Sequence, residues 1–269
     1  MASPPLPPPS NSPPSTTPKI PIKTTLPKLP FPPNQSRPSL TTPRLTIRPL
    51  RPSDLQSLHE IRSQPEVMIT NPQGRPDRDI TSETKPALDR FLSPADLTKF
   101  YFAICLRDSR DEDGGERGGD GGELEEKMIG IGGCHKIASM FGWPVVGYMI
   151  RREYWGRGLA TEFLVAWLGL WRGLPREEVV VEVDCRSVSS VGLGGGDEGE
   201  ENERGNGAGD VVKEVPVVPE QIVTWAVSGN IGSWRVMEKA GFAYLMTWTE
   251  ADLRDLAVDV ELKAYRYFV

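Results

Sequence analysis

The stretch Trp155-Gly156-Arg157-Gly158-Leu159-Ala160-Thr161 joins two segments of different character. Residues 145–150 before it form a short apolar run that is typical of a strand, and residues 160–171 after it are apolar at a helical period. A turn from a strand into a helix leaves the first backbone N–H groups of the helix without partners. Two glycines let the main chain approach a ligand closely, and the helix dipole favours negative charge. The stretch therefore predicts a site for a diphosphate at the start of the helix.

This turn differs from two familiar nucleotide-binding motifs. Its glycines are not followed by Lys-Ser or Lys-Thr, and the third glycine of a dinucleotide fingerprint is missing. A bare Gly-x-Gly turn also connects strands to helices that bind no ligand. Whether this turn binds one must therefore be judged from the surrounding sequence. A second glycine cluster, Gly130-Ile131-Gly132-Gly133, lies inside a predicted strand, where sheet packing or a bulge accounts for it.

Strand and helix patterns continue on both sides of the turn. Strands are predicted at residues 44–48, 100–106, 128–137, 145–150, 179–183, 221–227, 242–249 and 258–268, and helices at about 53–61, 82–92, 159–171 and 230–239. The runs 100–106 and 128–137 indicate neighbouring antiparallel strands, and the last two strands indicate another pair. These pairs favour an α/β fold of the α+β kind, with a mixed sheet rather than a doubly wound parallel one.

Composition divides the chain into a tail and one domain. Residues 1–43 repeat Pro-Pro-Ser and Pro-Leu-Pro patterns, which predict a disordered proline-rich tail. The tail has lysines and no acidic residue, so a transit peptide is the alternative, although its proline density opposes an amphipathic helix. Residues 44–269 are predicted to form one domain with low-complexity acidic insertions at about 107–127 and 186–218.

Charge and cysteine content narrow the classes of function. The formal net charge of −6 argues against a nucleic-acid-binding protein. Cys105, Cys134 and Cys185 have no paired spacing, so neither a disulfide framework nor a metal site is predicted. No apolar stretch approaches the roughly 18 residues that cross a bilayer. We expect a cytoplasmic protein with no membrane or nucleic-acid partner, and nothing in the sequence indicates its oligomeric state.

Three stretches, in order, resemble one enzyme family. Gly147-Tyr-Met-Ile followed by Tyr154-Trp-Gly-Arg-Gly-Leu-Ala-Thr-Glu162 is similar to motif A of the GNAT (GCN5-related) N-acetyltransferases, particularly the branch of ribosomal-protein N-terminal acetyltransferases. Asn230-Ile-Gly-Ser-Trp-Arg-Val-Met-Glu-Lys-Ala-Gly-Phe242 resembles a later motif of that branch. Thr42-Pro-Arg-Leu-Thr-Ile-Arg-Pro-Leu50 is a third match. The resemblance covers residue 42 to the last residue, apart from the insertions.

This resemblance implies a GNAT fold, an activity and a set of binding residues. The fold would be a mixed, mostly antiparallel sheet of six or seven strands, with a splayed central strand pair and flanking helices. The activity would be transfer of an acetyl group from acetyl-CoA, the co-substrate, to a primary amine of a small molecule or a protein N-terminus. The residues implied in cofactor binding are Arg157, Gly158, Leu159, Ala160 and Thr161, whose N–H groups would hold the CoA diphosphate, and Asn230, which would approach the pantetheine arm.

The catalytic residues depart from the common pattern of the family. Met237 stands where many members offer a tyrosine as proton donor to the leaving thiolate. Ser233, which the resemblance places opposite the thioester, is our candidate donor, and a serine that only caps the helix is the alternative. Glu153 is our candidate general base, against an exposed loop carboxylate, and His135 is a further candidate. A non-catalytic acyl-CoA-binding protein is the alternative function.

Overall fold

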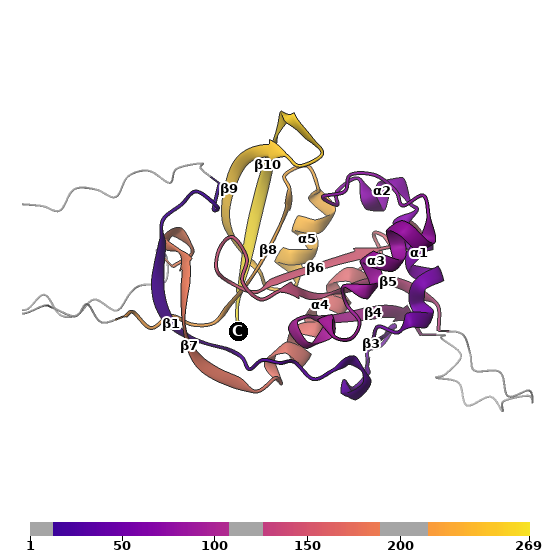
Figure 1. The fold of residues 1–269 in the computed structure, drawn as a ribbon, viewed down its shortest axis with the longest axis horizontal. Helices are drawn as coiled ribbons and strands as arrows, with labels where there is room; N and C mark the ends of the chain where they lie inside the picture. The colour runs from indigo at the N-terminus through magenta and orange to yellow at the C-terminus, as the bar shows by residue number, and fades with distance from the viewer. Residues whose placement is uncertain (1–12, 108–125, 189–214) are drawn as a thin grey trace, which may run out of the picture.

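An eight-stranded sheet forms the centre of the protein. A computed structural model describes residues 13–107, 126–188 and 215–269 (Figure 1). The strands of this sheet are β2 (Leu40–Thr41), β3 (Leu45–Pro49), β4 (Phe100–Leu106), β5 (Met128–Lys136), β6 (Val145–Ile150), β8 (Gln221–Val227), β9 (Ala243–Asp252) and β10 (Asp255–Phe268). They lie in the order β2-β3-β4-β5-β6-β8-β10-β9.

The two strands at the middle of the sheet are parallel and diverge. All other neighbours are antiparallel, whereas β6 and β8 run in the same direction. Their one registered pair within the described residues is Val145 with Val223, next to a 2.9 Å hydrogen bond from Val223 N–H to Pro144 O. The mixed, mostly antiparallel sheet with a splayed central pair is thereby confirmed. It has eight strands rather than six or seven because Leu40 and Thr41 add a short edge strand to β3.

Strand β4 is buried on both faces, which explains why its sequence is apolar throughout. Phe100, Phe102 and Ile104 pack into one hydrophobic cluster, while Tyr101 and Ala103 pack into another on the opposite face. This division follows from the two-residue period of a strand. A sheet covered on both sides needs helices on both sides.

The helices supply these two layers. They are α1 (Leu55–Arg62), α2 (Pro65–Met68), α3 (Lys85–Asp89), α4 (Leu159–Arg172) and α5 (Ile231–Lys239), with a π-helical turn η3 (Ile80–Thr84) before α3. Phe163, Trp167 and Trp171 of α4 join the cluster that holds Phe100, and Leu58 and Leu88 of α1 and α3 join the other. In the described part of the chain, no helix combines the length and apolar character needed to cross a membrane.

The proline-rich segment corrects one prediction. Residues Lys19–Pro27 form strand β1, which pairs antiparallel with strand β7 (Arg176–Asp184) in a separate two-stranded sheet. The disordered tail is therefore wrong for residues 13–43, although residues 1–12 lie outside the described residues. The strand signal in this proline-rich segment is the alternation of Ile20, Ile22, Thr24 and Leu26, of which the last three are buried.

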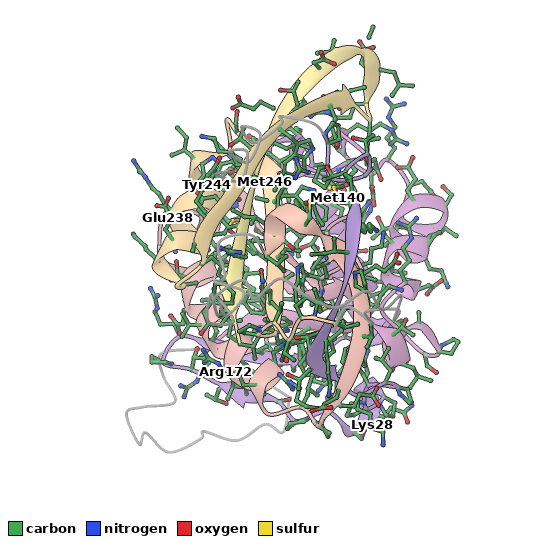
Figure 2. All side chains as sticks on the ribbon, turned by 90° about the vertical axis from the view of Figure 1, so that its left-hand side faces the viewer. Lys28, Met140, Arg172, Glu238, Tyr244 and Met246 are labelled. Atoms are coloured by element: carbon green, nitrogen blue, oxygen red, sulfur yellow. The ribbon has the colours of Figure 1, made fainter. Side chains whose placement is uncertain are left out.

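The β1–β7 ribbon covers the C-terminal half of the main sheet. Ile22 and Val183 pack with Val223, Trp248 and Leu262 of β8, β9 and β10 in a third hydrophobic cluster. Figure 2 looks onto this ribbon, with the β9–β10 hairpin projecting beyond it. Strand β7 was expected from the sequence, and the ribbon accounts for its place outside the main sheet. Most of the insertions predicted at 107–127 and 186–218 lies outside the described residues.

Candidate active site

The turn between β6 and α4 has the backbone geometry expected of an anion site. Gly156 and Gly158 have φ angles of 73° and 76°, in the left-handed region that favours glycine. The N-cap residue Gly158 has no side chain to cap the helix, whose first hydrogen bond runs from Glu162 N–H to Gly158 O at 3.0 Å. The N–H groups of Leu159, Ala160 and Thr161 precede that bond, so they are available to a ligand.

Aromatic side chains fix the approach to this turn. The Trp155 indole N–H donates to Ile150 O at 2.7 Å and so ties the turn to the end of β6. The guanidinium of Arg157 lies 5.3 Å from the centre of the Tyr154 ring, a buried side chain of the preceding 3-10 turn η6 (Arg152–Tyr154). Trp155 therefore has a structural role in the turn. Contacts with a ligand at this turn are left to the main chain.

Substitution of Gly158 provides a direct test of the turn. A Gly158→Val chain should bind CoA at least about tenfold more weakly, because a β-branched residue with positive φ costs roughly 1–3 kcal/mol and distorts the N–H groups. Isothermal titration calorimetry with CoA measures the change. The matched control is Gly169→Ala in the middle of α4, where an added Cβ meets no atom within 4 Å among the residues that the structure describes. Equal affinity in Gly158→Val and the unchanged chain would remove the turn from the CoA site.

A cavity of about 290 Å³ opens where β6 and β8 diverge. Its walls come from β5, β6, β8, α5, β9, β10 and the loop that follows α2. The lining residues with polar side chains relevant to chemistry are His135, Tyr148, Thr224, Asn230, Ser233, Glu250, Asp252 and Arg254. Arg254 pairs with Asp252 and donates to Ile69 O at 2.5 Å, so the hairpin between β9 and β10 meets the loop after α2 at one end of the cavity.

Asn230 and Ser233 are brought together at the start of α5. The Asn230 side chain accepts a 3.2 Å hydrogen bond from Ser233 N–H, which confirms Asn230 as the cap of this helix. Both residues line the cavity. Because Asn230 is the cap, the capping alternative for Ser233 loses its basis, and the Ser233 hydroxyl is available for another role.

Tyr148 projects from β6 into the same cavity. Its hydroxyl is buried and forms no hydrogen bond of ordinary geometry within the described residues, although the Ser233 hydroxyl is near enough to affect its pKa. Burial raises the pKa of Tyr148 to about 12, against the smaller opposing effect of Ser233. The phenol is therefore protonated at neutral pH and remains a potential donor.

Glu153 does not line the cavity. Its side chain is 47% exposed, and its carboxylate accepts a 2.9 Å hydrogen bond from Gln64 Nε2. Its own backbone N–H and Gln64 hold the pKa of Glu153 below its ordinary value. The position fits an exposed loop carboxylate, which was the alternative to a base.

Glu250 is the cavity carboxylate that sequence reasoning missed. It lies on β9, half-buried, and accepts a 2.9 Å hydrogen bond from the Trp248 indole N–H. His135 lines the cavity from the end of β5. Desolvation by the cavity walls, with the charges of Lys136 and Lys99, lowers the pKa of His135 to about 4, so its imidazole is neutral at pH 7. No local motif marks Glu250, because only the pairing of β9 with β10 at the edge of the sheet brings it to the cavity.

Comparison with known proteins gives the class of this protein. A family model described as an acetyltransferase (GNAT) domain matches residues 44–193, more than half of the chain. The chain belongs to the GNAT acetyltransferase family. No curated protein matches it by sequence.

Solved structures share the fold at low sequence identity. The microcin C7 self-immunity acetyltransferase MccE, in complex with acetyl-CoA and AMP, has a TM-score of 0.53 and 11% identity over 85% of this chain and 94% of that one. The ribosomal-protein-S5-alanine acetyltransferase from Vibrio fischeri has a TM-score of 0.50 and 15% sequence identity over 86% of this chain and 97% of that one. A GNAT-family acetyltransferase from Bacillus anthracis has a TM-score of 0.50 and 16% sequence identity over 86% of this chain and 98% of that one.

Membership in the family makes this protein an acyltransferase that uses acetyl-CoA. The described residues fit that co-substrate. The helix start with its left-handed glycines suits a diphosphate, and an added Cβ on Gly156 would meet no atom of the described residues within 4 Å, which leaves room for a ligand beside the turn. The cavity between β6 and β8 lies along the same strand that enters the turn.

Proposed function

We propose that this protein transfers the acetyl group of acetyl-CoA to the primary amine of a protein N-terminus or a small molecule. The observation that carries the proposal is the grouping of Glu250, Ser233 and Tyr148 around the cavity between the diverging strands. A carboxylate and two hydroxyl groups match the two proton transfers that the reaction requires. The amine must lose a proton, and the leaving sulfur must gain one.

Glu250 has the chemistry to receive the amine. A lysine amine has a reference pKa near 10.4 and an α-amine one near 8, so both enter the cavity mainly as cations at pH 7. A carboxylate in the cavity wall attracts such a cation and accepts its proton directly or through water. Glu250 replaces Glu153 in this role because it lines the cavity and Glu153 does not.

Ser233 and Tyr148 have the chemistry to serve the leaving group. The co-substrate supplies a thioester carbonyl, and its acyl transfer ends with a thiolate that needs a proton. Tyr148 remains protonated because burial raises its pKa to about 12, and Ser233 stands beside it at the start of α5. We assign Ser233 as the donor, with Tyr148 as the hydroxyl that returns its proton.

The experiment that tests the function is an acceptor panel. Purified full-length protein is incubated with acetyl-CoA, and thiol release is followed with peptides that have free N-termini, N-blocked peptides that contain lysine, polyamines and simple amines. The proposal expects thiol release that depends on the acceptor and mass-spectrometric evidence of an N-acetylated product. Tight CoA binding with no acceptor-dependent release would instead support a non-catalytic acyl-CoA-binding protein.

Removing a hydroxyl tests the donor pair. Ser233→Ala and Tyr148→Phe should each lower kcat by roughly 10²-fold with the Kd for CoA unchanged, because proton donation contributes in that range. Tyr148→Phe removes a buried hydroxyl without an ordinary partner, so its melting temperature should not fall. The control is Tyr244→Phe, an exposed β9 tyrosine whose hydroxyl bonds Thr247. Full kcat in both test variants would exclude the pair from catalysis.

A further inference from the structure

Arg44 joins the start of β3 to the diphosphate turn. Its Nη1 donates to Arg157 O at 2.7 Å, and its Nε donates to Glu162 Oε2 at 2.7 Å. Its backbone N–H also donates to Glu162 Oε1 at 2.9 Å, and the Thr42 hydroxyl donates to the same oxygen at 2.6 Å. These bonds fix the plane of the Arg44 guanidinium against the first turn of α4 from residues more than 110 positions away in the chain.

The remaining nitrogen of Arg44 is directed at the anion site. Nη2 forms no hydrogen bond within the described residues, and it lies 3.5 Å from the position that a Cβ on Gly158 would occupy. Gly158 is the residue whose left-handed conformation starts α4. The Arg44 side chain is 49% exposed, so a ligand at the turn can reach it. A guanidinium with two nitrogens held by protein oxygens therefore presents its third to the space where the helix N–H groups converge.

Glu162 explains why this arginine is needed there. Partial burial acts to raise the pKa of Glu162. The hydrogen bonds from Thr42 and Arg44 outweigh this effect and hold the pKa below its ordinary value. The ionised carboxylate in the first turn of α4 suits the helix dipole of the free protein, but it repels a bound diphosphate. Arg44 cancels that charge and leaves one donor facing outward.

We propose that Arg44 is a diphosphate ligand of the acetyl-CoA site, with Nη2 donating to a phosphate oxygen while Thr42 and Glu162 position the guanidinium. This adds a cationic side chain from β3 to a site otherwise built from backbone N–H groups. It depends on the acetyl-CoA site and not on the nature of the acceptor, so a failure of the amine proposal leaves it standing.

The test compares two variants that break the same ion pair from opposite sides. Arg44→Gln should weaken CoA binding by about ten- to a hundredfold, the range of a hydrogen bond to a charged group. Glu162→Gln should weaken CoA binding less than Arg44→Gln does, because the glutamine oxygen can still accept a hydrogen bond from Arg44 and a repulsive charge is removed. Isothermal titration calorimetry of the full chain with CoA, without an acceptor, gives both values. Arg152→Gln is the control, since Arg152 is a nearby exposed arginine that pairs with Glu66.

The salt dependence of the Kd for CoA and the melting temperature distinguish two roles of Arg44. One is a direct phosphate ligand, and the other is a contact that only holds the turn. The Kd for CoA should rise less steeply with ionic strength in Arg44→Gln than in the unchanged chain, because one charge contact is lost. Equal weakening in Arg44→Gln and Glu162→Gln, or an unchanged salt dependence in Arg44→Gln, would mean that the pair only holds the turn, and the proposal would fail. It would also fail if Arg44→Gln lowered the melting temperature and left the Kd for CoA unchanged.

Discussion

A chain that lacks residues 1–43 should not fold into a stable domain, whereas a chain that lacks only residues 1–12 should fold normally. Residues 13–43 contribute Ile22, Leu26 and Phe31 to the core, each 6% exposed or less. Phe31 packs on Phe100 and Trp171, with ring centres 5.5 and 5.9 Å apart. Removing a buried aromatic side chain costs about 3–5 kcal/mol, and a domain of ordinary stability has roughly 5–15 kcal/mol in total.

Polar contacts add to this dependence on the N-terminal segment. Asn34 N–H donates to Asp96 at 2.7 Å, and Arg37 donates to the carbonyl oxygens of Asp96 and Lys99. Truncation at residue 43 removes these partners as well and leaves the Asp96 carboxylate buried without its Asn34 contact, which is itself destabilising.

Melting experiments measure the effect and include a point variant that keeps the chain intact. Phe31→Ala should lower the free energy of unfolding by about 3–5 kcal/mol, while Leu29→Ala, at a position 39% exposed, should change it by less than about 1 kcal/mol. Thermal and urea unfolding followed by circular dichroism give these values. If the chain that begins at residue 44 melted cooperatively at the temperature of the full chain, residues 13–43 would have no part in the fold.

Local patterns predicted the parts of the fold that depend on neighbouring residues. The apolar period of α4, the cap at Asn230 and the antiparallel pair β4 and β5 all follow from residues close in sequence or from a simple hairpin. Strand β1 does not, because its partner β7 lies far along the chain, as the pair Ile22 and Val181, 159 positions apart, illustrates. Proline content outweighed a strand alternation whose partner was not visible locally.

The two halves of the candidate site differ in the same way. The diphosphate turn is one continuous stretch, so its glycines and its helix could be read directly from the sequence. The candidate catalytic cavity is assembled from several strands and α5, and Glu250 reaches it only because β9 pairs with β10, with Glu250 opposite Val260. Glu153, adjacent to the turn in sequence, is directed to Gln64 instead. Proximity in sequence was therefore a poor guide to proximity in the cavity.

Glu250→Gln should lower kcat/KM for an amine acceptor by roughly 10²- to 10⁴-fold, the usual contribution of a general base. Glutamine is nearly isosteric and keeps an oxygen that can accept from the Trp248 indole, so the melting temperature should change little. CoA binding should also be unchanged, because the diphosphate turn is built from the other end of β6 and from α4. Steady-state kinetics with the best acceptor from the panel, together with titration calorimetry for CoA, measure these quantities.

The matched control is Glu153→Gln, which makes the same chemical change in a carboxylate outside the cavity. Its kcat/KM should stay within about threefold of the unchanged chain, as for most surface substitutions. The opposite result, with activity lost in Glu153→Gln and kept in Glu250→Gln, would return the base to the turn, and equal loss in both would point to a shared electrostatic effect instead of a single base. The pair of variants thus separates a carboxylate adjacent to the motif in sequence from one that the fold carries into the cavity.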